Sequence, residues 1–522
     1  MSQGSSATPP TTSPTPQADR PRHTALVAQL RGSSLLLVGR VLSKFVNFGI
    51  QVAIVRLLTK DDFGAFAYGL AIVLAGELVV KFGLGRGANR FVPDYAQRGQ
   101  HAEILGTLAL TTAVIGLLGI FSFAALWWIS GQGWAGFPTG AGGRVVLILA
   151  VLAPVQAMDT ICIQTLACFS RPRAIFFRKH VLGPALRAAA VLAVFLAGGE
   201  TEMLAIAYVA GGVLGLVVCI RLTIKELHRH EVLPLALADW RVPWRPLFRF
   251  SLPLLSSDLV FITLTGVTTV LLMTTHGAVG VASMRAVVPA AALNTLVAQS
   301  FSILFMPAAM RVRARNDLDE LRKHHWQSAG WVTVLSFPIF ALTFGVAPDL
   351  VPILLGSEYL ESASLLALLA VGHYLSACMG FSGQMLQILD RTRAIVWTDF
   401  LSIATALCLA IILCPEYGAL GAAIAVTAAR VLGAVARQAV LLRTAEIGSV
   451  SLDQRRIWLK ALVATATIFA FGWFWQPPFA AQLVFITLVS ILLLRSTARE
   501  LDLGKSFPEL RRIPFLARLA GA

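Results

Sequence analysis

Four polar residues at helical spacing, two of them cationic, are the clearest candidates for chemistry in this sequence. An apolar stretch carries them at steps of four, three and four residues: Arg40, Lys44, Asn47 and Gln51. At about 100° per residue they share one narrow face of a helix. Lipid cannot solvate such a stripe, so we expect it to face a wet cavity or another polar helix. Two cations one turn apart repel each other unless an anion binds between them, so the stripe predicts an anion site.

Other apolar stretches also carry polar residues on one face. Asp258, Thr265 and Thr269 recur at steps of seven and four, so the second half of the chain offers an acid where the first half offers cations. The stretch 360–389 adds His373, Gln384 and Gln387, and the stretch 145–169 adds Gln156 and Asp159. A single histidine such as His373 is more often a packing residue than a proton carrier.

The acids inside apolar stretches have two interpretations. A charge at the bilayer centre costs about 2.5–3.5 kcal/mol, so it needs a partner or a function. Glu77, Asp159, Asp258 and Asp399 could therefore be buried ion pairs that neutralise Arg40, Lys44, Arg187 and Arg430. Any one of them could equally have a functional role, and the sequence leaves both interpretations open.

The chain around these residues is 57% hydrophobic and only 13% charged. Fourteen apolar stretches run along it, most of them long enough to cross a hydrocarbon layer that needs roughly 20 helical residues. We therefore predict an all-α polytopic membrane protein. The expected spans are 33–57, 64–86, 104–129, 145–169, 176–197, 202–222, 247–275, 279–309, 327–347, 360–389, 394–414, 417–442, 458–476 and 479–495.

The net charge of +16 would suit a nucleic-acid-binding protein, but the placement of the charges argues against that function. Lys and Arg gather on alternate loops, whereas the opposite loops hold only Lys60 and Arg144 together with several acids. This asymmetry predicts that both termini are cytoplasmic. Arg56 and Arg285 lie near the predicted outer ends of their helices, where long side chains commonly reach the lipid headgroups.

A duplication is suggested by two short motifs. Arg171-Pro172-Arg173-Ala174-Ile175 precedes the fifth span and Arg391-Thr392-Arg393-Ala394-Ile395 precedes the eleventh. Two parallel six-helix repeats, related by an axis along the membrane normal, would place a site between the halves. The predicted division is a disordered cytoplasmic tail over 1–32, six-helix bundles over 33–230 and 231–443, two additional helices over 444–495, and a cytoplasmic tail over 496–522.

Other kinds of site find little support. The six cysteines lie in apolar segments without metal-ligand spacing, so we expect packing residues rather than disulfides or a metal site. Gly83, Gly85 and Gly87 close a membrane helix, which predicts close helix approach or a helix end rather than a phosphate cradle. The largest outer loops, near 130–144 and 348–359, are short. We therefore expect no enzyme active site, no cofactor and no metal.

Several short motifs, taken in order, carry a resemblance to a known family. Residues 55–66 (VRLLTKDDFGAF) look like an Ala-Arg-Leu-Leu-Gly-Pro-Glu-Asp-Tyr-Gly signature, and Phe82-Gly83-Leu84-Gly85 looks like the next one. In the second half 356–359 (GSEY) and 417–423 (YGALGAA) fit as well. Over residues 32–443 the chain thus resembles the polysaccharide transporter, or oligosaccharide flippase, family. This family belongs to the MOP superfamily, with the MATE exporters and the lipid II flippase. Two departures are Thr59-Lys60 in place of Gly-Pro, and Lys81 where an acid often stands.

The resemblance implies a flippase that moves a polyprenyl-diphosphate-linked oligosaccharide across a bacterial inner membrane by alternating access, for exopolysaccharide, capsule or O-antigen synthesis. Implied partners are membrane lipids, a polysaccharide polymerase and chain-length proteins. On this basis the expected diphosphate ligands are Arg40, Lys44, Arg187 and Arg430. The expected sugar-binding residues are Asn47, Gln51, Gln384 and Gln387. Candidates for proton or sodium coupling are Asp258, Asp159 and Glu77.

Three alternatives differ in what they require. A MATE-like cation-coupled exporter of small molecules needs uncompensated carboxylates in its cavity, whereas the stripe of the first span is cationic. A membrane polysaccharide polymerase or ligase needs a large outer loop with clustered acids, Arg or His. A passive scaffold needs no inward-facing polar stripe.

Overall fold

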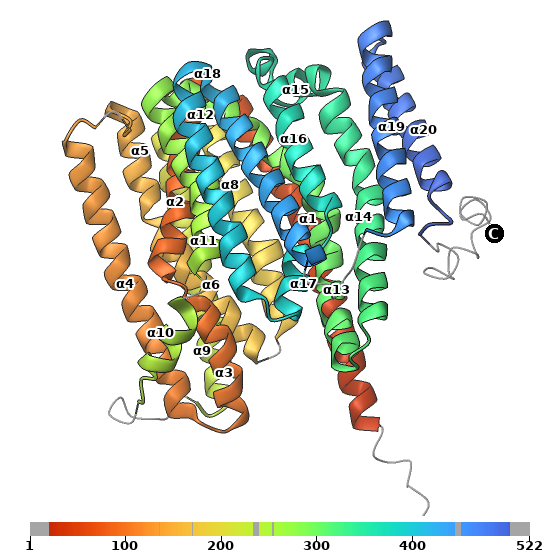
Figure 1. Cartoon of the computed structure of the whole chain (residues 1–522). Helices are drawn as coiled ribbons and strands as arrows, with labels where there is room; N and C mark the ends of the chain where they lie inside the picture. Colours follow the sequence, from red (N-terminus) through yellow and green to blue (C-terminus); the bar gives the residue numbers. More distant parts are fainter. Residues whose placement is uncertain are drawn as a thin grey trace, which may run out of the picture.

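The computed structural model describes residues 20–134, 136–169, 171–232, 240–252, 255–443 and 450–501, which are helical except for short connections (Figure 1). The α-helices of the first half are α1 (Arg20–Leu57), α2 (Lys60–Lys81), α3 (Leu84–Gln97), α4 (His101–Gly131), α5 (Gly140–Ala150), α6 (Leu152–Cys168), α7 (Pro172–Phe176), α8 (Gly183–Ala197) and α9 (Thr201–Arg229). Those that follow are α10 (Trp244–Ser251), α11 (Leu255–Ile262), α12 (Thr268–Ala292), α13 (Leu296–Ala314), α14 (Leu318–Gly345), α15 (Ala347–Leu355), α16 (Ser362–Cys378), α17 (Ser382–Ile388), α18 (Thr392–Arg443), α19 (Leu452–Trp475) and α20 (Phe479–Ser496). Tighter or wider turns join some of them: the π-helices η1 (Phe177–Leu182) and η4 (Thr263–Val267) and the 3₁₀ turns η5 (Leu293–Thr295) and η6 (Ser357–Tyr359).

Length and apolar composition make most of these helices suited to a membrane. In the described ranges twelve helical segments are long and apolar enough to cross one, from Val38–Leu57 to Phe479–Ser496. A helix satisfies its backbone N–H and C=O groups internally, which is the condition that hydrocarbon imposes. The expected all-α multi-pass membrane protein is thereby confirmed, whereas the side on which the termini lie stays a prediction.

Two of the twelve segments contain a break at a glycine. Gly277 (φ 64°, ψ −162°) interrupts α12, and Gly418 (φ 54°, ψ −127°) interrupts α18. In residues other than glycine, the Cβ clashes with the backbone at such φ and ψ angles. Gly277 falls between the predicted spans 247–275 and 279–309, and Gly418 is the second residue of the predicted span 417–442. Dividing both segments there reproduces the predicted order of spans, and the number of membrane crossings stays a prediction.

The second span ends earlier than the predicted range 64–86. Helix α2 stops at Lys81, and Phe82 and Gly83 then take left-handed φ values of 46° and 68°. The amphipathic helix α3 follows, which the search for long apolar stretches could not detect. A Cβ added to Gly87 of α3 would lie 2.7 Å from Leu247 Cδ1 of α10. The interpretation of these glycines as close-approach positions is confirmed.

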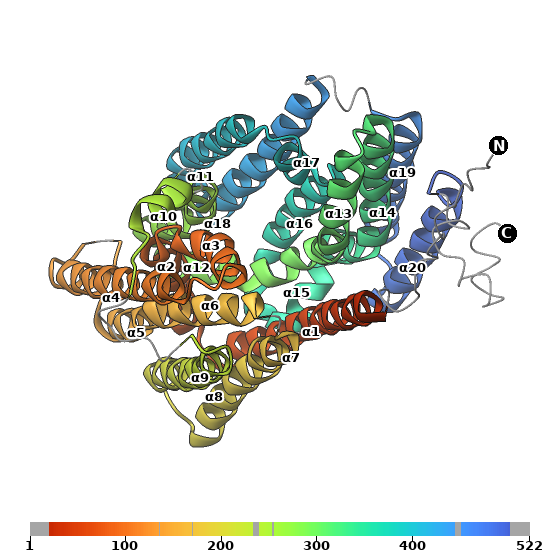
Figure 2. The same ribbon diagram turned by 90° about the horizontal axis from the view of Figure 1, so that it is seen from below.

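The contact of α2 with α12 joins the two groups of helices. A Cβ on Gly64 of α2 would lie 2.0 Å from the carbonyl oxygen of Ala278, so only glycine lets the backbones approach this closely. Around α2 pack α5, α6 and α9, whereas α16 and α18 pack with α12, and α14 packs with α16. Seen from below, α5, α6 and α9 lie at the lower left and α14 and α16 at the right, with α2 and α12 beside each other (Figure 2). The boundaries and the symmetry of the two predicted bundles stay predictions.

The two ends of the described chain lie differently from the rest. Helices α19 and α20 stand at one edge of the molecule and pack on α14 (Figures 1 and 2). Helix α1 begins at Arg20, so the disordered tail predicted over 1–32 is wrong from that residue onward. Residues 1–19 and 502–522 lie outside the described part of the chain.

We predict that Gly418→Ala destabilises the protein. At φ 54° and ψ −127° a Cβ is strained by roughly 1–3 kcal/mol, and it would also lie 2.9 Å from the His276 ring. The apparent melting temperature of the purified chain in detergent should fall. Gly472→Ala is the matched control, because no atom lies within 4 Å of a Cβ built on this helical glycine. Equal melting temperatures for the two variants would contradict the strain.

Candidate functional site

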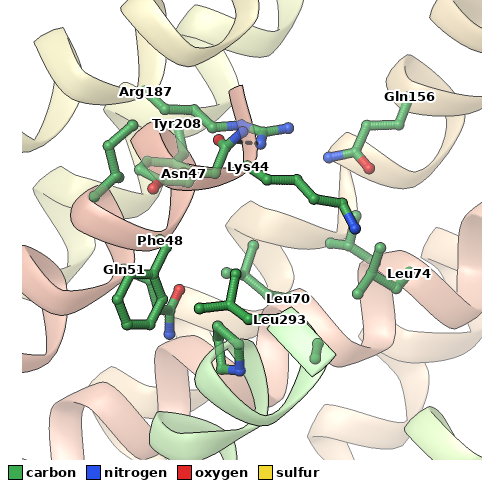
Figure 3. Close-up of a pocket in the computed structure, with 14 residues that line it drawn as sticks. Lys44, Asn47, Phe48, Gln51, Leu70, Leu74, Gln156, Arg187, Tyr208 and Leu293 are labelled. Atoms are coloured by element: carbon green, nitrogen blue, oxygen red, sulfur yellow. Dashed lines mark hydrogen bonds between the residues drawn. The ribbon is translucent and has the colours of Figure 1, made fainter. Parts of the chain in front are cut away.

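A cavity of about 370 Å³ lies between the two groups of helices, and we call it the central cavity (Figure 3). Helices α1, α2, α6, α8 and α9 line it from one side, and Pro289, Ala292 and Leu293 line it from the other. Apolar walls alternate with six polar side chains: Lys44, Asn47, Gln51, Gln156, Arg187 and Tyr208. A mostly apolar enclosure with a few convergent polar groups is typical of a ligand site.

Most of the stripe on the first span faces this cavity. Lys44, Asn47 and Gln51 line it, and the Lys44 side chain extends into the open centre of Figure 3. Arg40, one turn earlier, does not line the cavity, but its charge lies within electrostatic reach of Lys44 and Lys179. The stripe therefore faces a partly polar interior instead of lipid, as its spacing predicted.

The two cations in the central cavity contact neutral partners. Arg187 Nη1 donates to Asn47 Oδ1 at 3.1 Å, which joins α8 to α1 (Figure 3). Lys44 Nζ donates to the Gln299 side-chain oxygen of α13, across the interface between the two groups. Neither contact neutralises a charge, so both cations keep their attraction for an anion.

A second cavity, of about 390 Å³, lies within the first group of helices, and we call it the first-half cavity. It shares four lining residues with the central cavity: Asn47, Gln156, Arg187 and Tyr208. The π-helix η1 adds Arg178 and Lys179 to its lining. Neither residue is among the site residues predicted from the sequence. A signal that could have placed them is the Gly183-Pro184 pair, because helix distortions of this kind are common at functional sites.

The acids inside the helices form ion pairs, but not with the predicted partners. Glu77 accepts from Lys81 at 2.8 Å, Asp159 from Arg178 at 2.8 Å, and Asp258 from Arg86 at 2.6 Å. Asp399 lies 3.3 Å from Arg437. The prediction that they neutralise Arg40, Lys44, Arg187 and Arg430 is wrong, because a closer basic side chain takes each carboxylate. Within the described ranges, none of those four predicted cations has a carboxylate within 4 Å.

The second half contributes less to the two cavities than we expected. Arg430 of α18 lines neither the central nor the first-half cavity, although its charge and that of Lys44 both act on His373 of α16. Gln384 donates to the Ser302 hydroxyl of α13, and Gln387 is exposed. Neither glutamine lines the central or the first-half cavity, and their predicted sugar contacts find no support in this arrangement.

A set of polar contacts joins the two groups of helices at the Leu57 end of α1, and we call it the latch. Arg56 Nε donates to the Leu354 carbonyl oxygen at 2.8 Å and its Nη2 to that of Ile353. Its predicted reach to headgroups stays a prediction. Lys60 lies 2.5 Å from Glu361, which also accepts from Ser283 at 2.8 Å. These bonds join α1 and α2 to α12, α15 and the start of α16.

The latch and Arg86–Asp258 link the two groups at separate places. Arg86 belongs to α3 and Asp258 to α11, and the Arg90 guanidinium stacks 4.5 Å over the Phe250 ring of α10. The central cavity lies between these contacts. Arg86 is a partner that the sequence analysis did not consider for Asp258, since its motif suggested only helix packing.

Solved transporter structures share this architecture. A lipid II flippase, MurJ, in an inward closed conformation matches with a TM-score of 0.66 at 15% identity, covering 90% of this chain and 99% of that one. An inward-facing multidrug resistance MATE transporter of the MOP superfamily matches with a TM-score of 0.64 at 14% identity, covering 77% and 94%. An outward-facing MATE transporter of that superfamily gives 0.55 at 14% identity, covering 81% and 96%. The chain has the fold of a MOP-superfamily membrane transporter.

The family follows from the sequence itself. The family described as "Polysaccharide biosynthesis protein" matches residues 29–305, which is more than half of the chain. The chain belongs to this family, and the resemblance seen in its motifs is confirmed. Among curated proteins no sequence matches it.

We predict that the latch is insensitive to pH until strongly acidic conditions. Hydrogen bonds from Lys60 and Ser283 hold the pKa of Glu361 below its ordinary value of 4.5. A lowered pKa means that the stabilisation is complete above about pH 4.5 and is lost as the pH falls through the pKa of the folded protein. A cysteine at Gln51, labelled by an impermeant reagent from the predicted outer side, should stay protected until that range.

The substitution Glu361→Gln removes the charge at every pH. In a protein that carries it, the cysteine at position 51 should therefore be labelled several-fold faster even at neutral pH. Glu358→Gln is the matched control, because Glu358 contributes only its backbone carbonyl oxygen to Lys60. Equal labelling of the two variants would show that Glu361 does not hold this end closed.

Proposed function

We propose that this protein is a flippase for a polyprenyl-diphosphate-linked oligosaccharide, and that the central cavity holds the substrate's polar part. The observation that carries the proposal is that Lys44 and Arg187 line the cavity, with Arg40 one turn away on α1, and that none of these three described cations has a carboxylate within 4 Å. A diphosphate supplies the negative charge that these groups lack. Arginine suits phosphate recognition because its planar head donates two parallel hydrogen bonds, and lysine acts as a point charge.

The neutral polar residues complete the proposed site. Asn47, Gln51 and Gln156 line the same space as Lys44 and Arg187, and each amide both donates and accepts hydrogen bonds, as sugar hydroxyls require. Tyr208 adds an aromatic face with a hydroxyl. Gln384 and Gln387 stay candidates only for a conformation in which the second half is nearer.

The transport cycle proposed is alternating access between the two groups of helices. The latch joins the two groups at the end that the charge pattern assigns to the outside, which would be the closed end in an inward-facing state. We place the protein in a bacterial inner membrane with both termini cytoplasmic and without enzymatic activity. It would serve exopolysaccharide, capsule or O-antigen synthesis beside a polymerase and chain-length proteins.

Reversing Arg40 and Lys44 together to Glu should abolish translocation. Each cation contributes about 1.5–3 kcal/mol to a charged hydrogen-bond partner, so the rate should fall by at least roughly a hundredfold. The assay is the movement of a polyprenyl-diphosphate glycan across proteoliposomes, read by access of a glycan-cleaving enzyme. Mass spectrometry of co-purified lipid should also lose the glycan lipid.

The control for this experiment is Arg221→Glu with Lys225→Glu on α9. These two cations are also four residues apart on one helix, they are exposed, and they line neither cavity. If the reversal of two charges on one helix disturbs membrane insertion by itself, this control variant should show the same defect. Translocation at the wild-type rate by the Arg40/Lys44 variant would rule out the proposed diphosphate site.

For energy coupling we propose a proton or sodium ion acting at Asp258, with Asp159 and Glu77 as further candidates. Neutralising Asp258 would break a contact that links α3 to α11, so its charge state would bias the two facing states. Asp258→Asn should make the rate independent of an imposed gradient. Asp399→Asn is the control, because its pair with Arg437 joins the two parts of α18 on either side of Gly418, both within the second group of helices. A variant at Asp258 that keeps the wild-type gradient dependence would exclude this residue.

A MATE-like export of cationic small molecules is disfavoured by the same observation. Such a ligand needs carboxylates without partners, and the cavity acids Glu77 and Asp159 are already paired with Lys81 and Arg178. The likeness to MATE structures concerns the fold.

A further inference from the structure

An apolar groove runs along the outside of the molecule between α1 and α8, and we call it the side groove. Its volume is about 470 Å³. The small residues Gly49, Ala53 and Ala188 leave the space open, and Leu192 and Phe195 border it with side chains that are 56% and 59% exposed. The groove therefore faces the lipid.

The side groove meets the central cavity at Ile50, which lines both. The same two helices form the wall between them: Asn47 and Arg187 bond to each other, and the groove begins within one helical turn of this pair. From Gly49 to Leu57 it follows α1 for roughly 12 Å at 1.5 Å per residue. Its far end is Arg56, which the latch holds against α15.

Apolar surface alone does not select an occupant, because lipid tails are as apolar as the groove itself. Two other apolar grooves show the difference. One lies between α14 and α20 and the other between α4, α5 and α9, and neither shares a lining residue with the central cavity. Of these three grooves, only the side groove adjoins the central cavity and its cations Lys44 and Arg187.

We propose that the side groove binds the first isoprenoid units of the carrier lipid while its diphosphate lies at Lys44 and Arg187. This inference rests on the proposed function. A polyprenyl diphosphate has one chain attached directly to its anionic group, so anion site and chain path must meet at one point. Ile50 marks that point. A glycerophospholipid places a glycerol and two chains there, and a single groove beside a narrow cavity suits it poorly.

The experiment is photolabelling of the full chain in bilayers. The probe is a polyprenyl diphosphate with a diazirine in its first isoprene unit, and the comparison probe is a diazirine phosphatidylglycerol. Mass spectrometry maps the labelled residues. We expect the first probe to label Leu192, Phe195 and their neighbours in the groove. Unlabelled polyprenyl diphosphate should compete with it, and phosphatidylglycerol should not.

Two variants fill the groove without touching the cations. A side chain at Gly49 meets no atom within 4 Å at its Cβ, so Gly49→Leu should fold, and it should lower groove labelling by at least about tenfold because extra methylenes in an occupied site are costly. Gly116→Leu is the matched control, another exposed helical glycine with open space around a Cβ.

The same test can be repeated on α8 with Leu192→Trp. Its control is Leu196→Trp, because Leu196 is 74% exposed and lies outside the groove.

The outcomes distinguish failure of this inference from failure of the proposed function on which it rests. Equal labelling by both probes would show ordinary bilayer lipid in the groove and overturn the inference. Competed labelling at the α14–α20 groove instead would overturn it as well, while a translocation defect in the Arg40/Lys44 variant would leave the proposed function standing. No competed labelling anywhere, combined with normal translocation by that variant, would overturn both.

Discussion

Charge pairing in a medium of low dielectric constant governs this structure. A carboxylate without a partner is costly there, and the acids inside the helices have basic partners close at hand. Lys81 lies one turn from Glu77 on α2, and Arg178 reaches Asp159 from the π-helix that follows α7. Among the described residues, Lys44 and Arg187 of the central cavity have no carboxylate within 4 Å, and their hydrogen bonds lead to side-chain amides. The same constraint that holds the helices in register therefore leaves a positive interior.

Helix α1 brings the functional features together. One face presents Lys44, Asn47 and Gln51 to the central cavity, a neighbouring face contributes Gly49 and Ala53 to the side groove, and its end carries Arg56 of the latch. A helix with so many separate contacts cannot move without changing all of them. Movement of α1 relative to α15 would open the latch and alter the end of the groove at the same time.

The fold could be predicted largely from the sequence because hydrocarbon allows few solutions. Long apolar stretches had to be helices, and the breaks at Gly277 and Gly418 fall where the apolar stretches were divided. Helix α3 was missed because only one face of it is apolar, and the start of α1 at Arg20 lies in a segment too polar for a search by hydropathy. The inward direction of the first-span stripe followed from spacing on one helix.

Partners between helices could not be predicted in this way. Spacing shows which residues share a face, but Asp258 meets Arg86 across 172 positions of sequence, and Gln299 meets Lys44 across 255. Arg178 and Lys179 were not predicted as cavity residues for another reason: a π-helical turn rotates side chains away from the regular 100° spacing, and composition does not reveal it.

The bond from Lys44 to Gln299 links one of the cavity cations to the second group of helices. It ties α1 to α13 through an uncharged acceptor, which a phosphate oxygen outcompetes because charged acceptors form the stronger bonds. In the proposed transport cycle, binding of the diphosphate at Lys44 would therefore release a contact between α1 and α13. Until then, a single amide would help to hold the two groups of helices in one arrangement.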